Sequence, residues 1–196
     1  MSFIIMSYVD IIQYLIIFSL ILFIIGFLNS YYSKKYDDCS SFSSPDISLS
    51  SFDVSKKDYQ HNLRDYYIKS SYNSCAYDDF DNTFVKICAL DNVIKSGARF
   101  LDFEIYSVNN KPVISVSNVE DFEIQQSFQT LSFSEVMDRV KNRCFSNNGC
   151  PNPNDPVFLH FRIKSNQGEI CNEMAKTLMN TFGDDYLLGP NFSKSF

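Results

Sequence analysis

Two acidic residues, Asp102 and Glu104, stand two positions apart in a strongly apolar stretch of the sequence. Apolar and polar residues alternate from Phe100 onward, which is the period of a β-strand. The apolar face of this strand carries Leu101, Phe103 and Ile105, and the polar face carries Asp102, Glu104 and Tyr106. At a rise of about 3.3 Å per residue, the two carboxylates lie roughly 6–7 Å apart on one face.

Two interpretations of these carboxylates stay open at this point. A packed strand rarely carries two acids unless a partner, a metal ion or a catalytic task holds them. Alternatively, both are polar positions on the solvent-facing side of a half-exposed strand. The apolar opposite face favours a central strand with helices packed against its back.

A second alternating segment, residues 157–163, places His160 and Arg162 together on one face of a strand. For His160, two interpretations are open: it points toward a site shared with the carboxylates, or it is an ordinary packed histidine. The other histidine, His61, precedes the first predicted strand and is interpreted as a surface or cap residue.

Composition excludes some kinds of partner. The net charge of −6 argues against binding to nucleic acid. The sequence contains no Cys-x-x-Cys pair and no cluster of Cys and His residues, so a zinc site is not expected. The chemistry to explain is therefore that of carboxylates, an arginine and a histidine.

Predicted strands and helices alternate along the chain. Strands are predicted at 66–70, 100–106, 112–117 and 157–163, and helices at 84–94, after the Ser132-x-x-Glu135 capping box and through Ile170, Met174 and Leu178. Gly97 stands where a C′ glycine ends the first of these helices. A turn at 109–111 joins two strands in a hairpin-like sequence. This order predicts an α/β fold with a largely parallel sheet.

An apolar run of 18 residues, Ile11 to Leu28, lies near the N-terminus. As a helix with a rise of about 1.5 Å per residue it is roughly 27 Å long, enough to cross a thin hydrocarbon layer. A retained anchor is favoured over a cleaved signal peptide, because no Lys or Arg precedes the run and no small-x-small site follows it. Lys34 and Lys35 favour a single-pass protein with a cytosolic C-terminal domain.

The chain is predicted to have three parts: a membrane anchor at 1–32, a serine-rich flexible tether at 33–60 and a folded domain at 61–196. The six cysteines are expected to be free and mostly buried thiols, because the cytosol keeps cysteines reduced. Cys144 and Cys150 bracket a turn closely enough to bridge, which is the alternative.

Five segments, in order from about Leu63 to Gly189, resemble motifs of the X region of phosphatidylinositol-specific phospholipase C. Family motifs SSHNT, GCRxLELD, PVIYHGH, FxxV and PVILSLE correspond here to SSYNS at 70–74, GARFLDFE at 97–104, PVISVSN at 112–118, FSEV at 133–136 and PVFLHFR at 156–162. The chain also looks like the divergent phospholipase C-like proteins of large DNA viruses. The resemblance implies a TIM-type barrel, which takes about 250 residues when complete. We therefore expect its N-terminal half, either as a fragment or closed by a second chain.

The resemblance implies a proton relay between two histidines, with a calcium ion or an arginine that steadies the phosphate. Tyr72 and Asn118 occupy the positions of the family histidines, and neither side chain type titrates near neutral pH. Among the implied calcium ligands, Asn73 is retained. Asp102 stands where the family has Glu, and Glu104 stands where the family has Asp. The fourth ligand position carries Arg162, a cation that repels calcium and pairs with Asp102 or Glu104. No cofactor is therefore expected.

The resemblance implies a membrane-anchored phosphodiesterase-family domain at a cellular or virion membrane, with partners in the lipid bilayer and a phospholipid headgroup. The replaced histidines imply weak activity or none, as in a pseudoenzyme of lipid metabolism. One enzymatic alternative uses His160 and Asp102 as acid and base around a phosphate held by Arg162. The other alternative is a non-catalytic protein that binds lipid or phosphate or has a structural role in the membrane.

Overall fold

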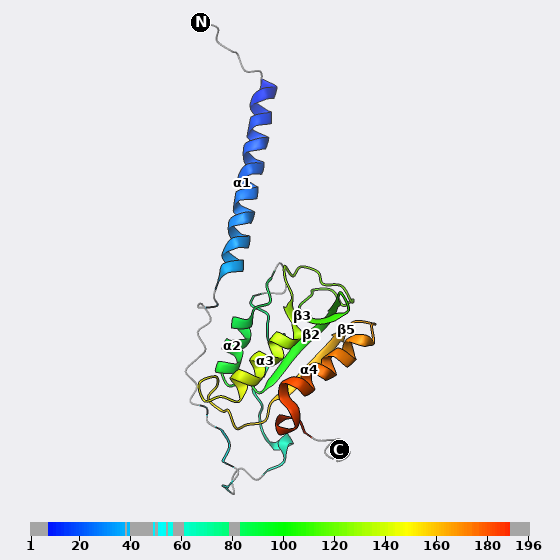
Figure 1. The fold of residues 1–196 in the computed structure, drawn as a ribbon. Coiled ribbons are helices and arrows are strands. Elements are labelled where there is room, and N and C mark those ends of the chain that lie inside the picture. The colour runs from blue at the N-terminus through cyan, green and yellow to red at the C-terminus, as the bar shows by residue number, and fades with distance from the viewer. Residues whose placement is uncertain are drawn as a thin grey trace. The chain divides into compact units, whose positions relative to one another are not determined.

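The computed structural model describes residues 8–37, 39, 49, 51–53, 55–56, 61–78 and 83–188. The chain divides into two compact units, Met1–Asp38 and Cys39–Phe196. The first unit contains one long helix, and the second is a mixed α/β domain (Figure 1). Most of the predicted tether lies outside the described residues.

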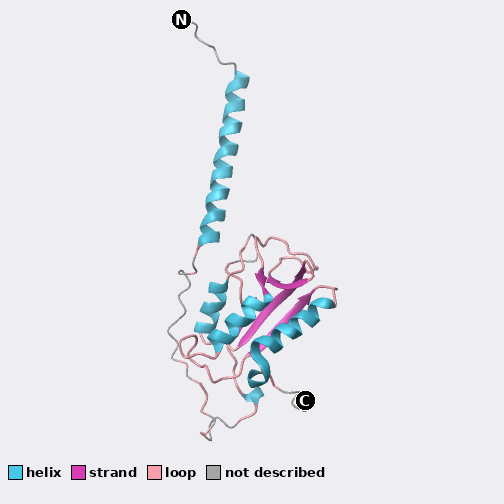
Figure 2. Cartoon of the chain, viewed as in Figure 1, coloured by secondary structure: helices cyan, strands magenta, loops and turns pink. Residues whose placement is uncertain are grey.

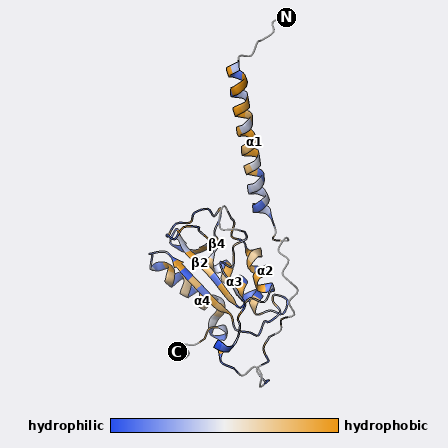
Figure 3. Ribbon diagram, turned by 180° about the vertical axis from the view of Figure 1, so that it is seen from behind, coloured by the Kyte–Doolittle hydropathy of each residue, from blue (hydrophilic) through white to orange (hydrophobic). Residues whose placement is uncertain are grey.

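Helix α1 spans Tyr8–Tyr36 and is longer than the predicted apolar run. The helix continues through Asp10 in its first turn and through Lys34 and Lys35 in its last turn. These charges suit their positions, because the helix dipole favours anions at the N-terminus and cations at the C-terminus. None of the described side chains of α1 is buried, and apolar residues cover most of its length (Figure 3).

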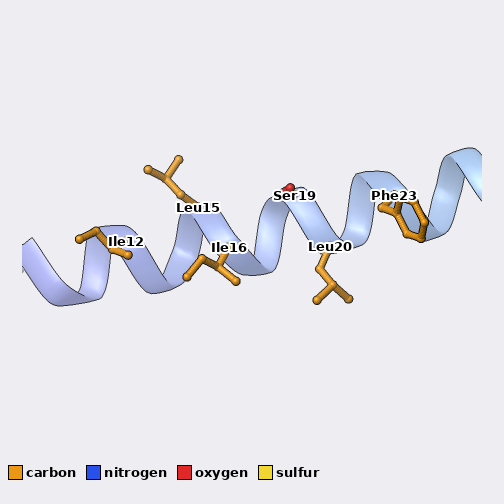
Figure 4. Close-up of a pocket in the computed structure, with 6 residues that line it drawn as sticks. All are labelled: Ile12, Leu15, Ile16, Ser19, Leu20 and Phe23. Carbon is orange, nitrogen blue, oxygen red and sulfur yellow. The ribbon is translucent and has the colours of Figure 1, made fainter.

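A shallow groove along α1 is lined by Ile12, Leu15, Ile16, Ser19, Leu20 and Phe23 (Figure 4). It is the space between neighbouring side chains of a single helix, so we assign it no ligand. A helix that is apolar all round is typical of a membrane span. Among the described residues α1 is the one helix that is long and apolar enough to cross a membrane, although a signal sequence meets the same criteria.

The domain has a curled, half-barrel sheet of five strands (Figure 2). The strands are β1 Ser70–Ser71, β2 Phe100–Val108, β3 Lys111–Ser115, β4 Leu131–Ser132 and β5 Phe158–Lys164. β1 and β5 run parallel to β2, whereas β3 is antiparallel to both β2 and β4. The predicted α/β class is therefore correct, but the prediction of a largely parallel sheet is wrong.

A tight turn causes the antiparallel pairing. Asn109 and Asn110 have positive φ angles of 52° and 59°. Two such residues in a row form the turn that matches the twist of a two-stranded hairpin, and asparagine tolerates this conformation. The chain therefore reverses directly from β2 into β3 without a helical crossover.

Strand β2 is the centre of the sheet. Phe100 pairs with both Ser70 of β1 and Phe158 of β5, and Glu104 pairs with both Ser115 of β3 and Arg162 of β5. Because a strand has only two edges, β5 occupies one edge of β2, and β1 and β3 share the other at different heights. The middle of that shared edge is left to the loop that follows β1.

Three helices cover the sheet: α2 Ile87–Lys95, α3 Phe133–Cys144 and α4 Glu169–Tyr186. Helix α3 lies between α2 and α4 (Figure 1). Their apolar side chains form one core with Leu101, Phe103 and Ile105 of β2, which are at most 1% exposed. The predicted apolar face of β2 is therefore confirmed.

Local predictions had mixed outcomes at the ends of elements. Gly97 follows α2 with φ of 85°, as predicted for a C′ glycine. The predicted capping box of α3 is wrong, because Ser132 makes no side-chain cap hydrogen bond and its hydroxyl bonds instead to the Ser134 hydroxyl. The predicted first strand at 66–70 is also displaced: a short 3-10 helix, η2 Leu63–Asp65, precedes it and β1 starts at Ser70.

The prediction of free thiols is wrong for two cysteines. Cys39 and Cys88, 49 residues apart in sequence, form a disulfide. Cys75, Cys144, Cys150 and Cys171 are free. The alternative bridge across the turn is absent, because the Cys150 thiol donates a hydrogen bond to the backbone oxygen of Cys144 instead.

Replacing Phe103 by Ala should lower the free energy of unfolding by about 3–5 kcal/mol, because it removes a fully buried aromatic ring. The measurement is chemical unfolding of the full chain in detergent. Phe122→Ala is the matched control, since Phe122 is 57% exposed and such a change costs about 0.5 kcal/mol or less. Equal losses in the two variants would contradict the assignment of Phe103 to the core.

Candidate functional site

The loop after β1 fills the open part of the β2 edge. The backbone N–H of Ser74 donates to the backbone oxygen of Asp102 at 2.8 Å, and the Ser74 hydroxyl accepts from the backbone N–H of Asp102 at 3.1 Å. The preceding residue, Asn73, has φ of 45° and donates its backbone N–H to the Asp102 carboxylate at 3.2 Å. Short polar residues thus replace a strand partner beside Asp102.

The side chains of Asp102 and Glu104 lie on the inner face of β2 and are almost fully buried, each 4% exposed. Both carboxylates meet the guanidinium of Arg162, which reaches them from the neighbouring strand β5. Burying two carboxylates without a cation would be strongly unfavourable. The ion pairs with Arg162 are therefore the central interaction of this cluster.

Arg162 uses every one of its N–H groups within the cluster. Its Nε donates to both Asp102 oxygens at 3.1 and 3.0 Å. Nη1 donates to Glu104 at 2.5 Å and to the Tyr72 hydroxyl at 3.0 Å. Nη2 donates to the side-chain oxygen of Asn73 at 2.6 Å and to Asp102 at 2.8 Å. A guanidinium has five N–H donors, and all five have an acceptor here.

The electrostatics of the cluster keep Asp102 ionised. Burial raises the pKa of Asp102, but hydrogen bonds from Arg162, His160 and the backbone of Asn73 outweigh it, so the pKa lies below its ordinary value. Burial lowers the pKa of Arg162, but the bond to Asp102 and the nearby Glu104 charge outweigh it and raise this pKa. The cluster therefore sets two carboxyl groups against one guanidinium.

His160 sits at the edge of the cluster. Its Nδ1 lies 2.8 Å from Asp102 Oδ2, and its side chain is 53% exposed. Because an ionised carboxylate only accepts hydrogen bonds, Nδ1 carries the proton, and Nε2 of a neutral ring is then an unprotonated nitrogen. The structure therefore places His160 with the carboxylates, which was one of the two interpretations from sequence.

Tyr106 completes the inner face of β2 and was not assigned to the site from sequence. Its hydroxyl donates to Glu104 at 2.8 Å, and the residue is 1% exposed. Burial and the bond to the Glu104 carboxylate raise the pKa of Tyr106, so it remains a hydrogen-bond donor. The signal was present in the sequence, because Tyr106 continues the same period of two as Asp102 and Glu104.

Tyr72 and Asn118, at the positions of the family histidines, differ in their contacts. Tyr72 is in the cluster: its hydroxyl accepts from Arg162, and its ring centroid lies 4.3 Å from the Arg162 Cζ. Asn118 donates from its amide to the side-chain oxygen of Gln126 at 2.6 Å, across the loop that follows β3. Tyr72 therefore contacts Arg162 directly, whereas Asn118 bonds to Gln126.

The residues do not fit the calcium ion that the resemblance implies. Asn73, Asp102 and Glu104 offer the oxygen ligands that calcium prefers, but each of them already bonds to Arg162. A second cation at these oxygens would face the guanidinium at short range. In the described part of the chain, no group of three or more His, Cys, Asp or Glu side chains is arranged to hold a metal ion.

The solved structures that resemble this chain include the crystal structures of L. pealei PLC21 and S. officinalis PLC21, with TM-scores of 0.48 and 0.49 and 17% sequence identity each. Each likeness covers 62% of this chain and 14% of the solved one, so this chain spans a small part of their length. No curated protein sequence matches this chain.

The family assignment rests on a family model. The model for the phosphatidylinositol-specific phospholipase C X domain matches residues 59–195, well over half of the chain. The matched range includes β1, β2 and β5, which supply Asn73, Asp102 and Arg162 or lead into them. This chain therefore belongs to the phosphatidylinositol-specific phospholipase C X-domain family.

Proposed function

We propose that this chain is a membrane-anchored phospholipase C-like domain that does not turn over phosphatidylinositol at a normal enzymatic rate. One observation carries the proposal: Arg162 commits all of its hydrogen-bond donors to residues of its own site. The domain then serves as a lipid-surface or structural protein with the family's fold. The family membership supports the phospholipase C-like part of the proposal.

A phosphodiester at this cluster would find little positive charge. Charge-assisted donors stabilise a phosphate only when their N–H groups are free to point at it. Arg162 would have to break bonds to Asp102 or Glu104 first, which would leave a buried carboxylate without its partner. The Asp102 carboxylate, which is kept ionised beside Arg162, also opposes an anionic substrate.

The positions of the two family histidines also lack side chains suited to proton transfer. A tyrosine hydroxyl and a carboxamide exchange protons poorly at neutral pH compared with an imidazole. The Tyr72 hydroxyl accepts a hydrogen bond from a guanidinium, and the Asn118 amide is bonded to Gln126. Both observations support a site that lacks the two proton carriers of the family.

A second candidate function is a weak phosphodiesterase that uses His160. The bond between His160 Nδ1 and Asp102, together with the exposed side chain of His160, favours it. A carboxylate that orients an imidazole in this way is a common arrangement for a general base. The chain has two histidines, so His61, which precedes η2, is a natural control.

We propose that the half-barrel sheet is part of a TIM-type barrel. The parallel strands β1, β2 and β5 and the helices against their outer face support it. β5 pairs with β2 on one edge and with no other described strand. A sheet edge of this length is normally paired or covered, so a further strand from a second chain or from another part of a longer chain is expected there.

The anchor is tested by a carbonate wash of membranes from cells that express the full chain. The chain should stay in the pellet, because α1 offers an apolar surface on all sides and requires a hydrocarbon environment. A chain that lacks residues 1–36 should be released. Release of the full chain, or a mature N-terminus near Ser30, would overturn the anchor, and the second result would identify the segment as a cleaved signal.

Calcium should not bind to the full chain, and inositol phosphate release from phosphatidylinositol vesicles should stay near background with or without calcium. Isothermal titration calorimetry and a release assay measure the two quantities. Arg162→Glu is the positive comparison. It should gain calcium binding, because three carboxylates and the Asn73 oxygen would then be free of the guanidinium.

Submicromolar calcium binding by the unaltered chain, with turnover of about 1 per second or faster, would overturn the silent-site proposal. Slow release that is lost in His160→Ala and kept in His61→Ala would instead support the second candidate function. Equal release in both variants would remove His160 from consideration as a base.

The stability of the domain should depend on Asp102 at acid pH. The pKa of Asp102 is lower in the folded than in the unfolded state, so its contribution is present above about pH 4 and is lost as pH falls through the folded-state pKa. In Arg162→Met the pKa of Asp102 should rise toward or above its unfolded-state value, because burial is then opposed by fewer hydrogen bonds, so the loss of stability on acidification should shrink or reverse. At neutral pH the variant should lose about 3–5 kcal/mol.

Unfolding of the full chain in detergent, followed by circular dichroism across the acid range, measures both effects. Arg139→Met is the matched control, because Arg139 pairs with Asp91 at a partly exposed position and such pairs contribute about 0–1 kcal/mol. An acid profile of Arg162→Met that overlays that of the unaltered chain would show that Arg162 does not set the ionisation of Asp102.

A further inference from the structure

We infer that the folded domain faces an oxidising compartment, on the extracytosolic side of the membrane that α1 is proposed to cross. The inference rests on the Cys39–Cys88 disulfide and on the proposed anchoring by α1. Disulfides persist in secretory and extracellular environments, whereas the cytosol keeps thiols reduced. The lipid headgroups that this domain can meet are then those of the leaflet on that side.

The disulfide is built into the domain at both of its ends. Cys39 is 2% exposed, and its backbone oxygen accepts a hydrogen bond from the side chain of Asn92 at 3.2 Å. Cys88 lies in the first turn of α2, which packs against α3 and contributes Leu90 and Ile94 to the core. Because Cys88 and Asn92 are one turn apart on α2, the same helix holds Cys39 by a covalent bond and by a hydrogen bond.

The disulfide is stronger evidence of orientation than the two lysines, which favour a cytosolic domain. Lys34 and Lys35 in the last turn of α1 predict a cytosolic domain, but this bias consists of two residues and Asp37 follows them. A reducing compartment, by contrast, would leave both cysteines as thiols.

The remaining cysteines provide a built-in reporter of orientation. Cys75, Cys144 and Cys150 are buried, whereas Cys171 is exposed on α4. Burial raises the pKa of Cys75 and raises that of Cys144 to about 12, so both react slowly with maleimides in the folded state. Labelling of the folded chain should therefore report Cys171.

The experiment uses intact cells that express the full chain at their surface membrane, treated with a membrane-impermeant maleimide before or after permeabilisation. Cys171 should label equally in both cases, and Cys171→Ser should abolish the signal. In a second readout, the chain is denatured with detergent and its thiols are counted with a maleimide that shifts its mobility. The count should be four before reduction and six after it, since the chain has six cysteines and one disulfide.

The outcomes separate the steps of the inference. Six thiols before reduction would show that the disulfide is absent from the chain in cells and would overturn the inference. Four thiols with Cys171 labelled only after permeabilisation would overturn the orientation while keeping the bond. Failure of the anchor itself is distinguished by the carbonate wash, in which the chain would leave the membrane regardless of its thiol count.

Discussion

The cost of burying two carboxylates on β2 governs the arrangement of this domain. Asp102 and Glu104 are each 4% exposed, and ionised groups in such positions need a cation and hydrogen bonds to be tolerated. Arg162 supplies the cation from a side chain. This requires β5, which carries Arg162, to lie beside β2. It also requires the loop after β1, which bonds to Arg162, to approach the same carboxylates.

The sheet register makes this contact possible. In the parallel pairing of β2 with β5, Asp102 lies opposite His160 and Glu104 lies opposite Arg162. Arg162 therefore meets Glu104 directly across the two strands. Its side chain also reaches Asp102, two residues earlier on the same face of β2. The loop at Asn73 approaches from the opposite edge of β2, in the space between β1 and β3. A shift of β5 by one residue would turn Arg162 to the other face.

Much of this could be predicted from sequence, because strand periodicity is a local property. The alternation around Asp102 fixes which side chains share a face, and the alternation in 157–163 does the same for Arg162. The resemblance then placed the two strands in one family fold. Tyr106 was overlooked as a member of the cluster, although the same period of two includes it.

Features that depend on distant contacts could not be predicted. The Cys39–Cys88 bond joins residues from a serine-rich segment and a helix, and nothing in their spacing selects that pair among six cysteines. The short β1 has a tertiary cause as well: its backbone groups pair with only two residues of β2, since the following loop bonds through Ser74 instead. At α3, Ser132 ends a strand and begins a helix, and its hydroxyl bonds to Ser134 rather than capping.

The disulfide also changes what a cut in the chain would do. Cys39 comes three positions after Tyr36, the last residue of α1, and Cys88 lies within the α/β domain. A protease that cleaves one peptide bond between these two cysteines leaves both pieces covalently joined through sulfur. Shedding of the domain from its N-terminal helix by such a cut would need reduction as well as proteolysis. Cleavage at positions 37 or 38 would release the domain in one step.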